Sequence, residues 1–582
     1  MPEDKVEAIE HVESSRHDAT VNEKAIADFL NAEKEMTTWQ AVRAHRRLLL
    51  FAAYRVTHLA ILPFVCASNY GYDTVSNGSS IAMPAFIMSF GAMNHATGSM
   101  YLPSIWTSLW TSMTNLGQAL GSLIAGFLAE RIGRRWTAVS LAILSIVGTF
   151  ILVFSSTRGM LLVGKTMNGA VVGGLMAIGT TYAADVAPIK LRGALLQAIV
   201  FFGVAMQGVS LGIVRAFILD MRPLAWKIVF GIQWAFATLV LIAAFLVPES
   251  PVFYVAHGKH DKAQSALRRL HGSSDQYLHI RYGAIVHALD EERKQQSESA
   301  SWPELFKGCN LKRTITIGFI MFSTSAIGVP FLTQNIYFLI TVGLNVTSVF
   351  DIGIGGFFLG CLFVMLGWLS NEGIGRRRLW LWGLIGNFLC MVTIGALGFS
   401  TTKASQLAIA VIMNVLISYG VYATVGVAWT ICPAISSHRL RQYSQSVAFI
   451  VGAVGGWLFN FITPYMYNVD SGNLGAKTGF VYAGLTVVVA VISWFLVPET
   501  AGLSVEDIDR AYEMGTAPRH FKSAKATHTL TEVDVGIFGL DSALDAPLVL
   551  QRLIGYANEA IFSLFIDQLT SVDFSLPESM GL

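Results

Sequence analysis

An aspartate inside an apolar stretch is the residue of this chain whose chemical role is easiest to infer. Asp73 lies in the segment 58–80, which is long enough to cross a bilayer as a helix. A carboxylate within a spanning helix costs about 2.5–3.5 kcal/mol on insertion scales, so it normally faces a cavity or a partner and marks an ion pathway. The alternative is a structural polar group, such as a hydrogen-bonded helix break. Asp73 is the first candidate for an ion-coupling group.

A second set of charged residues occurs in two copies. Three motifs return 242, 249 and 250 residues later: Gly133-Arg134-Arg135 as Gly375-Arg376-Arg377, Leu191-Arg192 as Leu440-Arg441, and Pro248-Glu249-Ser250 as Pro498-Glu499-Thr500. Such self-similarity in an apolar chain indicates a membrane protein built from two homologous halves. Paired charges at the ends of neighbouring helices can lock a closed state and release it. A topology anchor is the other interpretation of one copy, and two matching copies favour a gate.

Composition sets the class of protein. Of the 582 residues, 13% are charged and 53% hydrophobic, and the mean hydropathy is +0.54, which predicts an all-α polytopic membrane protein. Five scattered cysteines give neither a metal-binding spacing nor a disulfide framework. The sequence contains no Walker-type phosphate loop, so direct ATP drive is excluded. We expect no enzyme activity, no cofactor and no nucleic-acid partner.

About twelve apolar segments reach the roughly 20 residues that a spanning helix needs. We place them near 58–80, 104–129, 136–154, 159–182, 194–214, 226–247, 314–340, 349–369, 379–399, 405–432, 444–467 and 478–497. The expected organisation is an N-terminal tail (1–57), a six-helix half (58–250), a central loop with short helices (251–313), a second six-helix half (314–497) and a C-terminal tail (498–582).

Arginine and lysine in the short loops predict the orientation. One set of alternate loops holds ten of them and the opposite set holds five, namely Arg158, Arg215, Arg222, Lys403 and Lys477. By the positive-inside rule the richer set of loops is cytoplasmic, so both termini are expected in the cytoplasm. The expected location of the protein is the plasma membrane. Without a signal peptide, the first span acts as the targeting signal.

Two amphipathic helices are expected outside the spans. Ala263, Ala266, Leu267 and Leu270 have helical spacing within the central loop. A similar apolar stripe runs through 550–565 in the tail, interrupted by two charges, which is typical of a helix lying on a membrane.

The motifs resemble the sugar porter family of the major facilitator superfamily over about residues 60–525, and most resemble its fungal α-glucoside permease branch. The resemblance rests on the repeated motifs above, on Gly71-Tyr72-Asp73-Thr74, on Gly164-Lys165-x-x-x-Gly169, on Asp185-x-Ala187-Pro188-x-x-x-Arg192-Gly193 and on Trp226-x-Ile228-x-Phe230-x-x-Gln233-Trp234. It implies a major facilitator fold of twelve helices, alternating access, a monomer, and a sugar-like substrate carried with a proton.

The resemblance also implies roles for individual residues. Asp73 matches the aspartate that carries the symported proton, and Lys165 stands where the family has its arginine partner. Candidate cavity residues are Gln207, Gln334, Asn335, Trp429 and Asn460. Each amide alone could equally be an interhelical hydrogen bond. The candidate cytoplasmic gate consists of Glu130, Arg131, Arg134, Arg135, Asp185, Arg192, Glu249, Arg376, Arg377, Arg441 and Glu499.

Several family residues are replaced. Thr324, Ser325, Pro330 and Val200 stand at positions where the family holds hexose with amides, and Ala434 replaces a glutamate of the charge network. The best interpretation is a proton-coupled importer of an oligosaccharide or polyol-like solute. The loss of hexose contacts also suits an exporter of a fungal metabolite, and the long tail suits a nutrient receptor.

The loop charges generate a test of topology. A tag placed after Leu582 should be cytoplasmic, because ten cationic loop residues oppose five. Protease added to intact cells should leave the tag uncut and should cut it after permeabilisation. Cleavage in intact cells would reverse the orientation.

Overall fold

A computed structural model describes residues 57–93, 100–187, 189–271, 278, 281–287, 289, 302–370, 375–400, 402–437, 440–468, 470–501, 503 and 505–521. The chain divides into two units, 1–524 and 525–582, and all of the described residues belong to the first. The apolar stripe at 550–565 therefore lies outside the described residues.

The N-terminal half consists of six helical passes. They are α4 (Thr57–Ser79), α6 (Ser104–Ile132), α7 (Arg134–Val153), α8 (Arg158–Val186), α9 (Ile189–Phe217), and the pair α10 (Leu224–Gly231) and α11 (Gln233–Leu246). A 3-10 turn η1 (Ser80–Ala82), a short helix α5 (Pro84–Phe90) and a two-stranded antiparallel hairpin of β1 (Ala92–Met93) with β2 (Met100–Tyr101) connect the first two passes.

The C-terminal half repeats the pattern with two broken passes. Its first pass consists of α15 (Gly308–Ala326), α16 (Val329–Thr333) and α17 (Asn335–Thr341). The break follows Gly328, whose φ of +102° favours glycine, and Pro330 begins the next turn. The remaining passes are α18 (Val346–Ser370), α19 (Arg376–Leu397), α20 (Lys403–Gly420) with the π-turn η3 (Val421–Val425) and α21 (Gly426–Ile435), α22 (Arg441–Tyr467), and α23 (Thr478–Leu496) after the 3-10 turn η4 (Gly475–Lys477).

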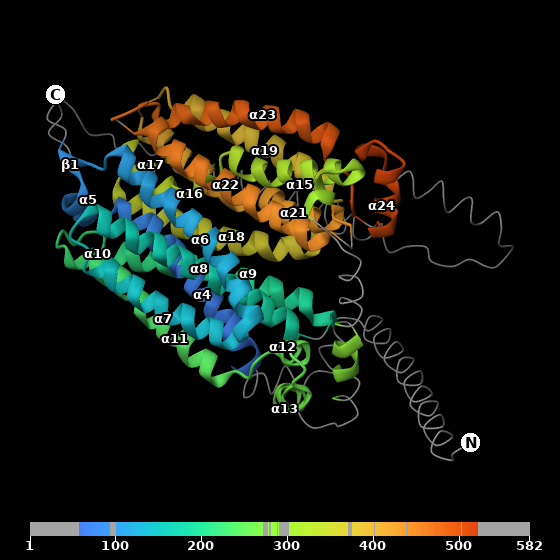
Figure 1. Cartoon of the computed structure of the whole chain (residues 1–582). Coiled ribbons are helices and arrows are strands. Elements are labelled where there is room, and N and C mark those ends of the chain that lie inside the picture. Colours follow the sequence, from blue (N-terminus) through green and yellow to red (C-terminus); the bar gives the residue numbers. More distant parts are fainter. Residues whose placement is uncertain are drawn as a thin grey trace, which may run out of the picture. The chain divides into compact units, whose positions relative to one another are not determined.

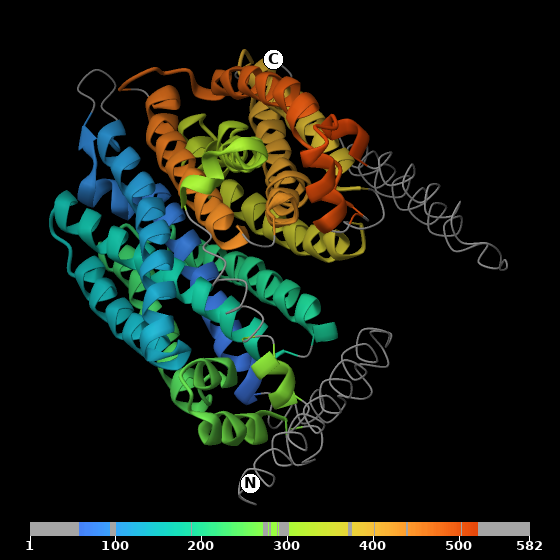
Figure 2. The ribbon, with the colours of Figure 1, turned by 45° about the vertical axis from the view of Figure 1, so that its right-hand side comes forward.

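Among the described residues, ten helical spans are long and apolar enough to cross a membrane. The two other passes, α4 and α6, carry more polar residues, which lower their hydropathy. Asn69, Asp73 and Asn77 lie on α4, and Asn115 and Gln118 lie on α6. With these two passes the described helices complete the predicted all-α membrane fold of two six-helix halves (Figures 1 and 2).

The two halves meet along two seams, α6 against α22 and α9 against α18. We call the end of the bundle that carries Gly133 and Gly375 the GRR face and the opposite end the far face. At the far face, the backbone N–H of Ser104 donates to Asp470 Oδ2 at 2.8 Å across the halves. Arg215 on α9 pairs with Asp351 on α18 at 2.9 Å. Hydrogen bonds and ion pairs therefore hold the halves together at the far face.

Short helices collect at the GRR face, at the opposite end of the bundle from α5 and β1 (Figure 1). They are α12 (Pro251–Ala256), α13 (His260–His271), η2 (Trp302–Phe306), α24 (Val505–Glu513) and η5 (Pro518–His520). The predicted stripe of α13 is confirmed, because its four apolar side chains are all buried. Arg313 at the start of α15 pairs with Asp509 on α24, which fastens α24 to the C-terminal half.

The left-handed glycine before α7 gives a test of the fold. Gly133 has a φ of +94°, and a Cβ there would lie 2.3 Å from Glu249 Oε2. Gly133→Ala should therefore destabilise the protein by about 1–3 kcal/mol. A lower melting temperature of the detergent-solubilised protein would show this. The matched control is Gly126→Ala, since nothing lies within 4 Å of a Cβ at that position. Equal melting temperatures for the two variants would contradict this account.

Candidate functional site

A cavity of about 350 Å³ lies between the two halves. The N-terminal half contributes α4, α6 and α9 to its walls, and the C-terminal half contributes α16 to α18, α20 and α22. A cavity at the interface of two repeats is the usual location of the substrate site in secondary transporters. The described lining residues include no Asp, Glu, Lys, Arg or His.

Four of the five predicted cavity residues line this space, namely Gln207, Gln334, Asn335 and Asn460. Gln334 is fixed by its neighbours, because its Nε2 donates to Asn460 Oδ1 at 3.2 Å and its Oε1 accepts from the hydroxyl of Tyr467 at 3.0 Å. Gln207 and Asn335 make no side-chain hydrogen bond within the described region, so their amides are available to a ligand.

Trp429 lies outside this cavity. Its side chain is 40% exposed and packs on Phe449, with the ring centroids 5.0 Å apart. The π-turn η3 precedes α21 and contains an extra residue compared with an α-helical turn, which changes the direction of the side chains that follow. Trp429 therefore does not reach the cavity in this conformation, although its spacing in the sequence predicted that it would.

Sequence reasoning missed the polar side of α6. Thr111, Asn115 and Gln118 line the cavity, and their spacing of four and three residues places them on one face of a helix. Tyr70, Thr74 and Asn77 form a similar row on α4. Both rows could have been found in the sequence as polar positions with helical period inside apolar segments.

Asp73 is fully buried on α4, beside the row that lines the cavity but not part of it. Neither of its carboxylate oxygens has a hydrogen-bond partner among the described residues. Asn69, one turn earlier, is also fully buried, and its amide nitrogen and oxygen lack partners there too. A buried carboxylate without a partner is costly in its charged form.

Lys165 is 1% exposed and lies among aromatic rings rather than beside a carboxylate. Its Nζ donates to the backbone carbonyl of Asn77 at 2.7 Å. The centroids of Phe86, Trp110 and Phe230 lie 5.7, 5.9 and 5.8 Å from that nitrogen, within the range of cation–π attraction. The described ion pairs include none between Lys165 and Asp73, so the pairing expected from the family is not made in this conformation.

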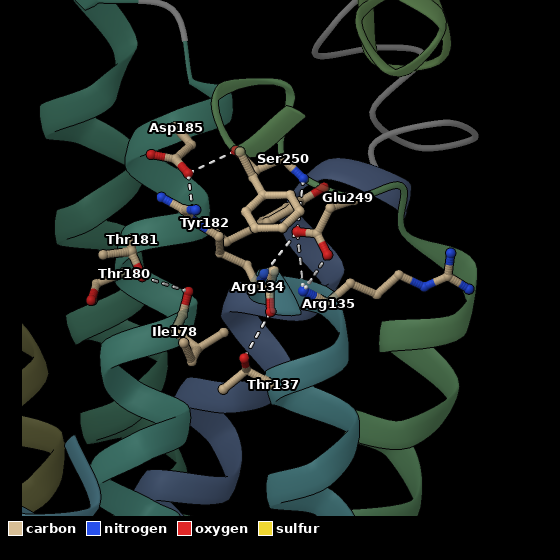
Figure 3. Close-up of polar contacts among 12 residues, drawn as sticks. Arg134, Arg135, Thr137, Ile178, Thr180, Thr181, Tyr182, Asp185, Glu249 and Ser250 are labelled. Carbon is tan, nitrogen blue, oxygen red and sulfur yellow. Dashed lines mark hydrogen bonds and ion pairs between the residues drawn. The ribbon is translucent and has the colours of Figure 1, made fainter. Parts of the chain in front are cut away.

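Four of the gate candidates of the N-terminal half form one connected network, shown in Figure 3, namely Arg134, Arg135, Asp185 and Glu249. Glu249 Oε1 accepts from the backbone N–H groups of Arg134 and Ser250, at 2.8 and 3.0 Å, and Arg135 also donates to this carboxylate. Arg134 pairs with Asp185 at 3.1 Å, and the Ser250 hydroxyl donates to Asp185 at 2.7 Å. Burial raises the pKa of Glu249, while these N–H groups and Arg134 oppose the rise.

The C-terminal half repeats part of this network. Glu499 Oε1 accepts from the backbone N–H of Arg376 at 3.0 Å. Arg377 donates to the carbonyl of Trp494 at 2.7 Å, as Arg135 does to the carbonyl of Phe245 at 3.1 Å.

The counterpart of Asp185 is absent from the second copy. Ala434 stands 249 residues after Asp185, the offset of the Leu-Arg motif, and has no carboxylate. The side chain of Arg376 instead reaches the hydroxyl of Thr500 at 3.4 Å. The charge network is therefore weaker on this side.

The remaining gate candidates are not part of these contacts. Glu130 and Arg131 are exposed, and Arg131 stacks on Phe127 at 4.2 Å from the ring centroid. The side chains of Arg192 and Arg441 lie outside those that the structure describes.

Comparisons with known proteins agree with this arrangement. A family model described as "Sugar (and other) transporter" matches residues 59–512. Among relatives, the MFS transporter fmqE of Aspergillus fumigatus is 99% identical over 527 residues, which cover 90% of this chain and 99% of the relative. The general alpha-glucoside permease of Saccharomyces cerevisiae is 27% identical over 517 residues, with 86% of this chain and 82% of the permease covered.

Solved structures show the same fold. The inward open conformation of the xylose transporter XylE from E. coli has a TM-score of 0.61 at 18% identity, with 78% of this chain and 98% of that chain covered. A crystal structure described as the D-xylose-proton symporter has a TM-score of 0.60 at 17% identity, with 77% and 100% covered. Because the family model matches well over half of its length, this chain belongs to the sugar porter family of the major facilitator superfamily.

Proposed function

We propose that this protein is a secondary active transporter of the plasma membrane that moves an uncharged, sugar-like solute together with a proton by alternating access. The observation that supports this proposal most strongly is that two features lie side by side at the interface between the halves. An uncharged cavity lined by amides lies beside a fully buried carboxylate that has no partner among the described residues.

The cavity chemistry supports a sugar-like solute. The side chains of Gln and Asn offer a donor and an acceptor together, which suits adjacent hydroxyl groups. Gln118, Gln207 and Asn335 line the space, and none of the three has its side-chain amide engaged with another described residue. The relatives named as alpha-glucoside and maltose permeases support the same substrate class.

The surroundings of Asp73 support a proton as the coupled ion. A carboxyl group that is protonated when buried, and charged when it meets water or a cation, can carry a proton across a conformational change. The structural neighbour described as a proton:xylose symporter supports this form of coupling. Lys165 is linked to the cavity wall, because its Nζ donates to the backbone carbonyl of Asn77 and the Asn77 side chain lines the cavity.

Export is the second candidate function. None of the four positions at which this chain lacks the family's hexose amides lines the cavity, so this site differs from the hexose pattern. An exporter would cause its product to accumulate inside cells on deletion, whereas a symporter would alkalinise the medium during uptake. A nutrient receptor would lose signalling, but not binding, on truncation after Arg519.

The coupling proposal predicts the behaviour of Asp73→Asn. This change preserves shape and removes the titratable group, so accumulation against a gradient should fall at least about tenfold, while exchange of solute persists. Uptake of labelled α-glucosides into proteoliposomes with an imposed pH gradient measures both. Asp220→Asn is the matched control, because Asp220 lies in a far-face loop and pairs with Arg222 two residues away. Concentrative, pH-dependent uptake by Asp73→Asn would show that Asp73 is only structural.

The gate network predicts an asymmetry between the two halves. Arg134→Ala removes the ion pair to Asp185 and should slow transport severalfold at unchanged surface expression. Arg376→Ala should have a smaller effect, because its side chain contacts a hydroxyl and makes no ion pair with any residue that the structure describes. Arg131→Ala serves as the control, since Arg131 is exposed and stacks on Phe127. Initial uptake rates normalised to surface protein compare the three variants, and equal losses for Arg134→Ala and Arg131→Ala would leave the motif as a topology anchor.

A further inference from the structure

The cavity has two chemically different walls. One is the seam of α6 and α22, and the other is the seam of α9 and α18. Resting on the function proposed above, we infer that the preferred substrate is an uncharged glycoside with an apolar, flat aglycone, so that sugar hydroxyls bind one wall and the aglycone binds the other.

The absence of charge limits the substrate class. A phosphorylated, carboxylated or amino sugar would bring an ion into a cavity whose described lining residues are all neutral. Desolvating an ion without a counter-charge is far more costly than desolvating hydroxyl groups that regain hydrogen bonds. The cavity therefore selects against ionic sugars.

The α6 and α22 seam, which we call the polar wall, presents a row of hydrogen-bonding groups. Thr111, Asn115 and Gln118 lie on one face of α6, and Asn460 lines the cavity from α22. Asn460 is engaged at both amide atoms, because its Nδ2 donates to the carbonyl of Gly456 at 2.8 Å and its Oδ1 accepts from Gln334. From Thr111 to Gln118 the helix rises roughly 10 Å, at 1.5 Å per residue. Asn115 uses its Nδ2 within the helix, by donating to the carbonyl of Thr111 at 2.9 Å, which leaves its oxygen as an acceptor. This length suits a row of hydroxyl groups longer than one pyranose ring.

The α9 and α18 seam, together with α20, forms the apolar wall. Val204 and Leu211 line it from α9, Phe357 and Val364 from α18, and Ile417 from α20. Gln207 is the only amide that α9 contributes among the described lining residues. A ligand that filled this side with hydroxyl groups would leave most of them without partners, at a cost for each.

Two polar residues of α20 do not change this character. The Asn414 amide donates to the carbonyl of Ala410 at 2.9 Å, and the Ser418 hydroxyl donates to the carbonyl of Gly356 at 3.0 Å. The glycine at position 356 allows α18 and α20 to approach this closely, because a Cβ there would lie 2.3 Å from Asn414 Oδ1. The Ser418 hydroxyl is thus used to pack α20 against α18, and Asn414 uses its amide nitrogen within α20, which leaves its oxygen as one acceptor on a side otherwise lined mainly by apolar groups.

The experiment compares substrates within one preparation of the full-length protein. Uptake of 4-nitrophenyl α-glucoside, maltose, glucose and glucose 6-phosphate is measured in yeast lacking its own glucose and glucoside transporters. The aryl glucoside should be taken up with a kcat/KM about tenfold or more above that of glucose, because apolar contacts of this size give such discrimination. Glucose 6-phosphate should not be taken up.

Substitutions in each wall test whether the apolar wall causes the preference for the aryl glucoside. Val204→Asn or Ile417→Asn should reduce the ratio of aryl glucoside to glucose uptake at least about fivefold, and Val204→Ile should preserve it. Asn115→Leu should lower the uptake of all sugars together. The results for Val204 and Ile417 are ratios within one variant and do not depend on how much protein reaches the membrane, whereas uptake by Asn115→Leu is normalised to surface protein.

The outcomes separate this inference from the proposed function. Equal or better transport of glucose by the unmodified protein, or transport of glucose 6-phosphate, would overturn the two-wall inference while leaving sugar transport in place. If none of the four sugars is taken up, sugar import itself fails, and the inference fails with it.

Discussion

A carboxylate that caps a helix from more than a hundred residues away organises each half of this transporter. The start of α7 leaves backbone N–H groups without helical partners, and Glu249 satisfies two of them. A negative charge at this end also interacts favourably with the helix dipole. Glu499 accepts from one such N–H group, that of Arg376, at the start of α19. The glycine before each helix has a φ near +95°, and its missing Cβ leaves room for the carboxylate.

This constraint joins the first and last parts of each half. The loop between the second and third passes is fastened to the segment that leaves the sixth, so the six helices end at a common closure. The N-terminal closure includes an ion pair, because Asp185 faces Arg134, whereas Ala434 cannot supply an acid to the second copy. The halves are therefore alike in architecture, but among the described residues only the N-terminal closure adds an ion pair to its capping glutamate.

Much of the fold followed from the sequence, because hydropathy and the internal repeat are strong signals over long segments. The six-plus-six arrangement, the stripe of α13 and the pairing of both glutamates with the arginine loops were all accessible in this way. Side-chain directions were less accessible. Trp429 matched the family by spacing, yet a π-turn changes where its helix points. The rings around Lys165 come from α5, α6 and α10, and no local pattern in the sequence brings these three elements together.

The cavity and the coupling groups share residues rather than merely lying close together. Trp110 lines the cavity and also stands over the ammonium group of Lys165, and Asn77 lines the cavity while its carbonyl accepts from the same ammonium group. Asp73 lies one turn before Asn77 on the same helix. A ligand that presses on Trp110 or Asn77 therefore acts on two of the four contacts around the Lys165 ammonium group, the others being the rings of Phe86 and Phe230. These two contacts of Lys165 are with a ring and a carbonyl rather than with a carboxylate. Breaking them therefore leaves no carboxylate without its partner. Under the coupling proposed above, substrate binding and proton release would be linked through this one short segment of α4.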